Sequence, residues 1–391
     1  MMSSMASIRD ADVLIERAIA ISGLPPRGVE SFRPGLEALL PDMARSTTLK
    51  PGARGRIEDF AVATLTARLK VEDWFATHSE ADTPVERPLF IVGMPRAGTT
   101  LLFNMLRFDS RRRVFWHWEG NREVPPAEAA HLHDDPRIAL RVAEVNAMLE
   151  DGVLPRNHHV ELGDEPTECI WQLAQDFKGY PWLVQTLAPN YFEWLMHEAD
   201  MTAAYRYHKR VLQVVQSRAP GWWTLKLPSH AAALSALLEV YPDARIVLTH
   251  RDPVKPVGSS SSLVDQIMAQ QNDPVDRVGI GYQTAKLLAL SAQRMSAARD
   301  ANPDVPFLDM HYKAFVADPM AEVRRLYAFI ERDLPDDVAK LMEGALARHN
   351  AERDQHAAHR YRLEDYGLSR EKLAPMFADY VERYRIAPEK D

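Results

Sequence analysis

The chain has 391 residues, of which 46% are hydrophobic and 26% charged, a composition that excludes a disordered or fibrous protein. Its formal net charge of −8 argues against a broad nucleic-acid-binding surface, so an anionic ligand has to be held by local basic groups. Cys169 is the one cysteine and no apolar run approaches the roughly 20 residues of a membrane span, so we expect a cytoplasmic protein without disulfides, bound metal or membrane-spanning segments.

Amphipathic stretches at residues 10–22, 34–44 and 55–77 predict three helices at the start of the chain. None of them carries enough apolar residues to form a core of its own. A polar, proline-containing stretch follows them and marks a boundary. We therefore expect residues 1–84 to form a helical segment that packs on a domain made by residues 85–391.

Residues 87–103 read RPLFIVGMPRAGTTLLF and form the most informative stretch of the chain. The apolar, β-prone run 89–92 predicts a short strand buried on both faces, and Gly93 ends it. The apolar spacing from Thr99 onward predicts a helix that packs back on this strand. Because free amide groups and the positive end of the helix dipole then meet in one small volume, we expect an anion to bind there.

The glycine spacing in this loop indicates which kind of anion is bound. Gly93 and Gly98 stand where the glycines of the nucleotide-binding loop G-x-x-x-x-G-K-S/T stand. Thr99 takes the lysine position, Thr100 takes the Ser/Thr position, and the cation of the loop is Arg96 instead. Such a loop can hold a phosphate through amides and hydroxyls but is poorly equipped for a triphosphate with Mg²⁺. A glycine-containing turn that binds nothing is the alternative.

A candidate general base follows the next predicted strand, at 114–116. Glu119 lies just beyond that strand, and the carboxyl ends of parallel strands line the same edge of a sheet as the loop. The flanking Trp116 and Trp118 are expected to desolvate the carboxylate partly and to raise its pKa, which suits a general base. An exposed turn glutamate is the alternative interpretation, and His117 is the competing base.

Residues 134–217 are expected to form a long helical insertion. The predicted helices are 136–149, 166–177 and 191–216. The aromatic side chains of this segment suit a core, and part of them suit the apolar wall of a ligand pocket. His158 and His159 lie near two acids but lack a metal-binding spacing on a helix face, so we expect no metal there.

A strand predicted at 222–225 places Lys226 at the same edge of the sheet. This lysine is either a surface cation or the charge that neutralises a group in transfer, and we favour the second interpretation. Ser229 is expected to cap a helix at 231–241. His230 either orients a substrate or sits in the first turn of that helix without a further role.

A second phosphate-binding arrangement follows the predicted buried strand 244–249. Arg251 begins the loop after this strand, and Ser259 lies eight residues later on the following helix. A guanidinium binds two phosphate oxygens at once, and a hydroxyl adds a further donor. The spacing alone is weak, but its position after the first loop makes it a strong signal. The serines at 260–262 are alternates for Ser259.

These motifs together resemble the sulfotransferase family, from about Arg87 to the C-terminus. P-R-A-G-T-T resembles the loop that holds the 5′-phosphosulfate of 3′-phosphoadenosine 5′-phosphosulfate (PAPS), and Arg251 with Ser259 resembles the pair that binds its 3′-phosphate. W-E followed by P-P, within 118–126, resembles the segment that carries the catalytic glutamate. K-L-P-S-H from Lys226 resembles the K-x-P-x-H segment. The similarity is greatest to bacterial sulfotransferases related to tyrosylprotein sulfotransferases.

The resemblance implies a P-loop-type α/β fold with a mostly parallel sheet and helices on both faces. It also implies transfer of the sulfuryl group of PAPS to a hydroxyl of a small apolar acceptor, without a metal. Glu119 is the implied general base, with Arg96 and Lys226 stabilising negative charge and His230 orienting the acceptor. The residues implied to bind PAPS are Arg96, Ala97, Gly98, Thr99, Thr100, Arg251, Ser259 and Arg360.

The C-terminal stretch 359–368 resembles a family segment that closes over the nucleotide. Arg360 or Arg362 is the basic residue expected to contact the nucleotide, and a solvated charged loop is the alternative. Two other functions compete with sulfuryl transfer. A P-loop kinase or NTP hydrolase would need the missing loop lysine, and a catalytically silent nucleotide-binding protein would tolerate the loss of Glu119 or Lys226. Steroid, lipid, phenol and polyketide all fit the expected acceptor, and the sequence does not indicate the oligomeric state.

Overall fold

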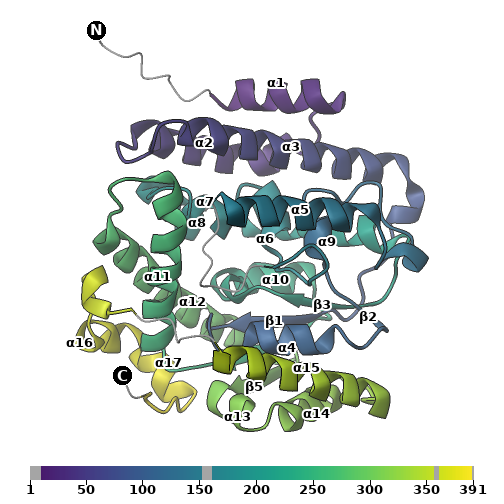
Figure 1. Cartoon of the computed structure of the whole chain (residues 1–391), viewed down its shortest axis with the longest axis vertical. Helices are drawn as coiled ribbons and strands as arrows, with labels where there is room; N and C mark the ends of the chain where they lie inside the picture. Colours follow the sequence, from purple (N-terminus) through teal and green to yellow (C-terminus); the bar gives the residue numbers. More distant parts are fainter. Residues whose placement is uncertain (1–9, 152–160, 356–360, 390–391) are drawn as a thin grey trace.

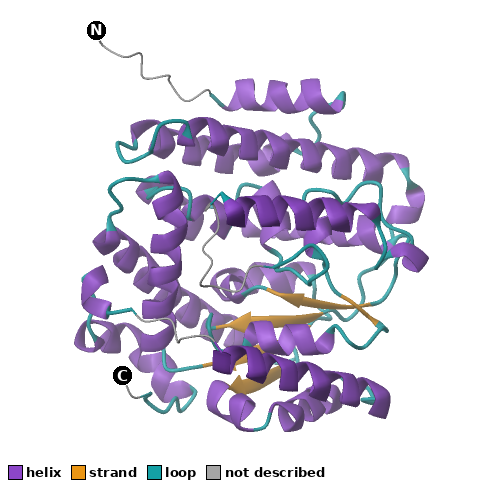
Figure 2. Cartoon of the chain, viewed as in Figure 1, coloured by secondary structure: helices purple, strands orange, loops and turns teal. Residues whose placement is uncertain are grey.

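The computed structural model describes residues 10–151, 161–355 and 361–389. Within these ranges, five parallel strands form one sheet in the order β2-β3-β1-β4-β5. The strands are β1 (Leu89–Gly93), β2 (Arg112–Arg113), β3 (Trp222–Lys226), β4 (Arg245–His250) and β5 (Phe307–His311). Helices cover both faces of the sheet (Figures 1 and 2), so the predicted α/β fold is confirmed.

The helices fall into three groups along the chain. The first group precedes the sheet and consists of α1 (Ala11–Ser22), α2 (Val29–Arg45) and α3 (Ala53–Thr77). After α4 (Thr99–Leu106), the insertion between β2 and β3 contains α5 (Pro136–Glu150), α6 (Ile170–Gln175), α7 (Tyr180–Leu183), α8 (Pro189–His197) and α9 (Met201–Gln216). The remaining helices are α10 (Leu234–Val240), α11 (Val254–Gln271), α12 (Arg277–Ala301), α13 (Tyr312–Ala317), α14 (Pro319–Phe329), α15 (Asp336–Gln355), α16 (Arg370–Leu373) and α17 (Ala378–Arg383).

Strand β1 lies at the centre of the sheet, and all five of its residues are buried. Phe90 and Val92 pack in one hydrophobic core with α9, α10 and α12, whereas Leu89 and Ile91 pack in a second core with α4 and α14. This alternation follows from the period of two along a strand, and it explains why an apolar run without polar interruptions forms this strand.

The N-terminal helices share a third hydrophobic core with the insertion, and Val71 of α3 also belongs to the core that contains Phe90 and Val92 of the sheet. In Figure 1 they form an outer layer, and the insertion helices lie between this layer and the sheet. Charged contacts add to the apolar ones, because the buried Asp176 pairs with Arg68 of α3 at 2.8 Å and with Lys178 at 2.7 Å. The insertion is therefore held between two layers, and its position depends on both.

Several predicted boundaries were wrong. Strand β2 lies two residues before the strand predicted at 114–116, and Trp116 forms only an isolated bridge with Pro166. The helix predicted at 191–216 is divided into α8 and α9, because the side chain of Asp200 caps α9 by accepting from the amide of Ala203 at 3.0 Å.

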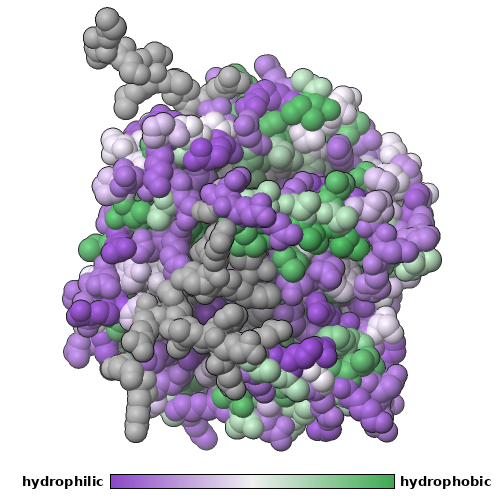
Figure 3. All heavy atoms as spheres, in the orientation of Figure 1, coloured by the Kyte–Doolittle hydropathy of each residue, from purple (hydrophilic) through white to green (hydrophobic). Residues whose placement is uncertain are grey.

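Further along the chain, a 3₁₀ turn at Pro228–Ala233 precedes α10, and Ser229 does not cap that helix. None of the described helices combines the length and the apolar character that crossing a membrane requires. Hydrophilic residues dominate the face drawn in Figure 3, with hydrophobic residues gathered over α5, where Leu140 is 58% exposed.

Candidate active site

The loop between β1 and α4 has the backbone that the sequence predicts for an anion site. Gly93 and Gly98 have φ angles of 125° and 82°, and a side-chain carbon on Gly93 would lie 2.4 Å from the carbonyl oxygen of Thr249. Both positions therefore require glycine. The N-cap residue of α4, Gly98, has no side chain that could cap the helix, so the amides of the first turn keep their hydrogen-bonding capacity for a ligand. Ala97 and Thr99 are buried, whereas Thr100 is exposed.

Two arginines lie close together beside this loop. Arg251 donates a hydrogen bond from Nη1 to the carbonyl oxygen of Arg96 at 2.5 Å. Within the described residues, the guanidinium of Arg96 makes no hydrogen bond and no salt bridge. Desolvation and the neighbouring charge of Arg251 lower the pKa of Arg96. The loop thus carries a positive charge, that of Arg96, which no carboxylate of the described residues balances. This excess of positive charge favours an anionic ligand.

Arg251 also binds a carboxylate from the C-terminal segment. Its Nε and Nη2 atoms donate to the two carboxylate oxygens of Glu389, both at 2.8 Å, and its guanidinium stacks 3.9 Å from the ring of Tyr312. The amide of Glu389 donates to the Asp252 carboxylate at 2.7 Å and so holds this segment in place. Ser259, half-buried on α11, makes no side-chain hydrogen bond within the part of the chain that the structure describes. Arg251 is therefore paired in a geometry that a phosphate could adopt instead.

Lys226 ends β3 beside the first turn of α4. Its buried ammonium group forms a salt bridge with Glu168 and lies 3.4 Å from the hydroxyl of Thr100. The Lys226 side chain is 1% exposed, whereas that of Glu168 is 25% exposed. The amide of Cys169 donates to the carbonyl oxygen of Lys226 at 3.1 Å, which holds the glutamate beside the lysine. This pair brings one acid and one base to the phosphate loop.

Sequence reasoning missed Glu168. The residue lies in an irregular segment before α6, without the strand end or motif that drew attention to Glu119. Its position depends on the contacts of its neighbours, namely the bridge between Trp116 and Pro166 and the hydrogen bond between Cys169 and Lys226. The helix predicted at 166–177 includes Glu168, and nothing in that prediction assigns a chemical role to this residue.

Glu119 occupies a different environment from the one that its flanking tryptophans predict. The carboxylate is fully buried, and one of its oxygens forms a salt bridge with the buried Arg113. The other oxygen accepts from the amide of Trp116 at 3.0 Å. Arg113 also donates to the carbonyl oxygen of Ala219 at 3.2 Å. Both carboxylate oxygens of Glu119 therefore have partners nearby in the sequence. Through Arg113, the ion pair also connects this segment with Ala219, which precedes β3.

The two histidines considered as acid or base groups are buried as well. Burial, and then the charge of Arg141, lower the pKa of His117 to about 4. His230 is completely buried, and its Nδ1 lies 2.7 Å from the hydroxyl of Tyr205. Burial lowers the pKa of His230 well below its ordinary value. Both imidazoles are therefore held neutral by burial, and a role for His230 in orienting the acceptor stays a prediction.

His230 belongs to a buried group of possible metal ligands. The ligand atoms of Cys169, His208 and His230 all lie within 4.8 Å of one another. The Nε2 atoms of both histidines lack a hydrogen-bond partner in the described structure. Cysteine sulfur and histidine nitrogen are ligands that zinc accepts, so these three residues could hold a metal ion, and they are far apart in the sequence.

The C-terminal segment lies next to Arg251 and Ser259, the two residues predicted to bind the 3′-phosphate. Arg360 lies outside the described residues. The Arg362 side chain is 75% exposed and is 3.7 Å from Glu364. Tyr361 donates to the carbonyl oxygen of Lys255 at 3.1 Å, and its ring leaves no space for a side chain at Gly258. The segment thus packs on the first half of α11, which carries Ser259.

Comparison with known proteins gives one consistent result. The model of the sulfotransferase family matches residues 88–336. The curated relatives are omega-hydroxy-beta-dihydromenaquinone-9 sulfotransferases Stf3 of Mycobacterium bovis and Mycobacterium tuberculosis, each 27% identical over 252 residues. These matches span 61% of this chain and 61% of each relative.

Solved structures match over a longer part of the chain. Sulfotransferase STF9 from Mycobacterium avium is 36% identical, with a TM-score of 0.91 and 100% coverage of both chains. Sulfotransferase STF1 from Mycobacterium tuberculosis is 26% identical, with a TM-score of 0.83, and the match covers 95% of this chain and 99% of that one.

Proposed function

The chain belongs to the sulfotransferase family, and from this premise we propose that it transfers the sulfuryl group of PAPS to a hydroxyl of a small apolar acceptor. The observation that carries the proposal is the salt bridge between Lys226 and Glu168 beside Thr100 of the phosphate loop. It supplies a cation for the group in transfer and a carboxylate for the proton, side by side at the place where an anion is expected.

In this proposal, the donor is held at two separate ends. The free amides of the loop and the guanidinium of Arg96 bind the 5′-phosphosulfate, with Thr99 and Thr100 adding hydroxyls. Arg251 and Ser259 bind the 3′-phosphate. Because Arg251 is paired with Glu389, the donor has to displace this carboxylate before it can bind fully.

The transfer step assigns one task to each member of the Lys226–Glu168 pair. The acceptor oxygen forms a bond to sulfur as the bond between sulfur and the bridging phosphate oxygen breaks. Glu168 takes the hydroxyl proton of the acceptor, while Lys226 and Arg96 stabilise the charge on the departing phosphate oxygen. Proton uptake by Glu168 weakens its attraction to Lys226 at the moment when the leaving group needs that charge. Adenosine 3′,5′-bisphosphate and the sulfated acceptor are the products.

The class of acceptor is supported by a relative. The name of Stf3 describes a sulfotransferase for omega-hydroxy-beta-dihydromenaquinone-9, an apolar molecule with a hydroxyl group. We infer an apolar acceptor with a hydroxyl for this chain too. The match to Stf3 covers 61% of each chain, so the proposal extends to this class of acceptor and not to the particular molecule in the name of Stf3.

The test is a transfer assay with the full-length protein, sulfur-labelled PAPS and a lipid extract. The proposal predicts a labelled, organic-soluble product that forms without added Mg²⁺ and disappears in the variant Glu168→Gln. A P-loop kinase predicts Mg²⁺-dependent binding of ATP instead, and a silent binding protein predicts nucleotide binding without any product. Either of these outcomes overturns the proposal.

A further inference from the structure

The buried group of Cys169, His208 and His230 lies next to Phe90 of the central strand β1. Cys169 is the N-cap residue of α6, His208 lies on α9, and His230 lies in the 3₁₀ turn after β3. The sulfur of the cysteine and one ring nitrogen of each histidine lie within 4.8 Å of one another, and the three residues are at most 1% exposed. Three segments that are far apart in the sequence therefore meet at one point inside the protein.

Each histidine of this group is oriented by a tyrosine. The hydroxyl of Tyr241 lies 2.6 Å from Nδ1 of His208, and the hydroxyl of Tyr205 lies 2.7 Å from Nδ1 of His230. The two imidazole rings are perpendicular, with an interplanar angle of 89°. Metal-binding histidines typically have an outer partner of this kind, which holds the ring and fixes its tautomer through the nitrogen that does not bind the metal. When the hydroxyls accept from Nδ1, both Nε2 atoms present a lone pair.

The Nε2 atoms of the two histidines are the polar atoms that the fold leaves unpaired. Within the described residues, neither Nε2 of His208 nor Nε2 of His230 has a hydrogen-bond partner, although both atoms are buried. Burying a polar atom without a partner is unfavourable, and native proteins leave few such atoms. An ion bound by both nitrogens and by the nearby sulfur of Cys169 would remove this cost.

The ligand atoms of the group indicate the class of ion. Thiolate and imidazole suit Zn²⁺ and Cu⁺, whereas Mg²⁺ and Ca²⁺ prefer oxygen ligands. Among the described residues, no carboxylate belongs to the group. Zinc lies about 2.3 Å from sulfur and about 2.1 Å from nitrogen, so ligand atoms around it are about 3.3 to 3.8 Å apart. The three atoms thus have to approach one another by about 1 Å to bind the ion, which small side-chain rotations can provide.

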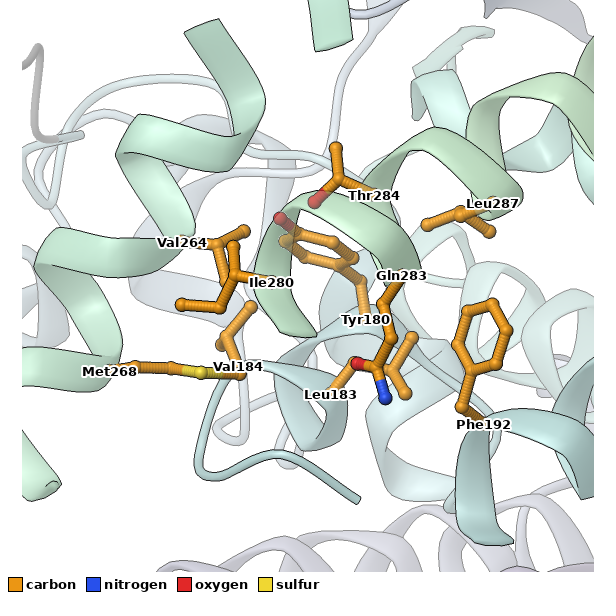
Figure 4. A pocket seen from close by; sticks show the side chains of 10 residues that line it. All are labelled: Tyr180, Leu183, Val184, Phe192, Val264, Met268, Ile280, Gln283, Thr284 and Leu287. Atoms are coloured by element: carbon orange, nitrogen blue, oxygen red, sulfur yellow. The ribbon is translucent and has the colours of Figure 1, made fainter. Parts of the chain in front are cut away.

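The neighbouring cavities offer no comparable ligands. Figure 4 shows one of them, lined by side chains of α7, α8, α11 and α12, none of which is a histidine, a cysteine or an acid. A second cavity shares Tyr180, Leu183 and Leu287 with the first and is also lined by Tyr205, whose hydroxyl bonds to His230. The buried group therefore borders a cavity on the side of Tyr205, which leaves a short path for an ion that enters.

We propose that Cys169, His208 and His230 bind a structural Zn²⁺ or Cu⁺ ion that connects α6, α9 and the 3₁₀ turn after β3. The proposal replaces the expectation of a chain without bound metal, because only the fold brings these ligands together. It does not depend on the proposed function, since the ligands are not among the residues assigned to the transfer step. Cys169 follows Glu168 directly, and its amide donates to the carbonyl oxygen of Lys226 at 3.1 Å. The ion would thus fix the backbone that carries this pair.

The first experiment measures the metal content of the full-length protein, produced without a polyhistidine tag in medium that contains zinc and copper salts. Elemental mass spectrometry should find about one ion per chain and identifies whether it is zinc or copper. Cys169→Ser should lower the content to less than about 0.1 ion per chain, because a hydroxyl is a poor ligand for these ions. His117→Gln, which changes a buried histidine outside the group, is the matched control and should keep the ion.

A second experiment uses the unmodified chain and serves if the Cys169 variant does not fold. The protein is produced in medium in which Co²⁺ replaces zinc and copper. Co²⁺ bound to a thiolate has a charge-transfer absorption band that Co²⁺ bound to nitrogen and oxygen alone lacks. Because Cys169 is the one cysteine of the chain, this band assigns the sulfur ligand directly. Loss of the ion should also lower the Tm, since an ion that binds only the folded state stabilises it.

The proposal is overturned if the protein holds less than about 0.1 ion per chain and shows no Co²⁺–thiolate band. It is also overturned if the Cys169→Ser variant folds and keeps its full metal content, because the ion is then bound elsewhere. Sulfate transfer from PAPS by a protein without metal contradicts the metal site and leaves the proposed function standing. A protein that contains the ion and transfers no sulfate does the reverse.

Discussion

Two glutamate–cation pairs lie near the sheet, and they differ in access. The ion pair between Glu119 and Arg113 is closed to solvent, since their side chains are 2% and 1% exposed. The second carboxylate oxygen of Glu119 accepts a hydrogen bond from the amide of Trp116. Glu168 with Lys226 is open on the acid side, where the carboxylate is 25% exposed, and the lysine reaches Thr100. The comparison teaches that a carboxylate between two tryptophans in sequence can lie buried in an ion pair, while a partly exposed carboxylate lies in an irregular segment.

The largest difference is expected in turnover. Glu168→Gln removes the proton acceptor but keeps the size of the side chain, so kcat should fall by about 10²- to 10⁴-fold. Binding of adenosine 3′,5′-bisphosphate should change by less than about threefold, because the nucleotide contacts are separate. Steady-state kinetics and calorimetric titration measure the two quantities. A kcat near that of the wild type would exclude Glu168 as the base.

Glu119→Gln should act on stability instead. It leaves the charge of Arg113 buried without its counter-ion, which costs about 3 to 5 kcal/mol of the free energy of unfolding. Urea denaturation measures this loss, and activity per folded molecule should be retained. The double variant Arg113→Met with Glu119→Leu is the control, since apolar replacement of both partners should recover much of the stability. A large loss of kcat at unchanged stability would restore Glu119 as the base.

Arg251 lies at the other end of the proposed donor site, where we expect a substitution to change nucleotide affinity more than turnover. Arg251→Ala should weaken adenosine 3′,5′-bisphosphate by about ten- to a hundredfold, the loss expected for hydrogen bonds to a charged group. Adenosine 5′-phosphosulfate, which lacks the 3′-phosphate, should be affected much less. If a calorimetric titration shows that both nucleotides lose the same amount of affinity, Arg251 does not bind the 3′-phosphate.

The smallest expected effect has the opposite sign. Glu389→Gln weakens the carboxylate that competes for Arg251, so the affinity for adenosine 3′,5′-bisphosphate should rise by about two- to fivefold, the range of a partly exposed ion pair. Glu382→Gln, an exposed change on α17, is the matched control and should have no effect. Weaker binding in the Glu389 variant would mean that the carboxylate supports the site rather than competes for it.

Sequence reasoning succeeded where local structure determines the geometry. The strand, the loop and the helix start around Gly93 and Gly98 follow one another in the chain, and so do the strand end and helix that carry Arg251 and Ser259. These parts of the fold could be predicted from apolar runs and glycine positions alone, because each arrangement depends on neighbouring residues.

Prediction failed where distant segments decide. Glu168 reaches Lys226 through contacts made by Pro166 and Cys169, which no local pattern encodes. Glu389 and Arg251 are 138 residues apart in the sequence. The ion pair of Glu119 could not be predicted either. Its partner Arg113 belongs to the run of arginines at 111–113, which is typical of a solvated turn, but the structure buries this residue. Burial and pairing of this kind are tertiary properties.

The central claim, that two separate basic sites bind one bisphosphorylated adenosine, is tested most directly by calorimetric titration of the full-length protein without Mg²⁺. The account predicts that adenosine 3′,5′-bisphosphate binds at least about tenfold more tightly than adenosine 5′-monophosphate, a difference that one charge-assisted phosphate contact supplies. Equal affinity for the two nucleotides, or tighter binding of ATP once Mg²⁺ is added, would contradict it.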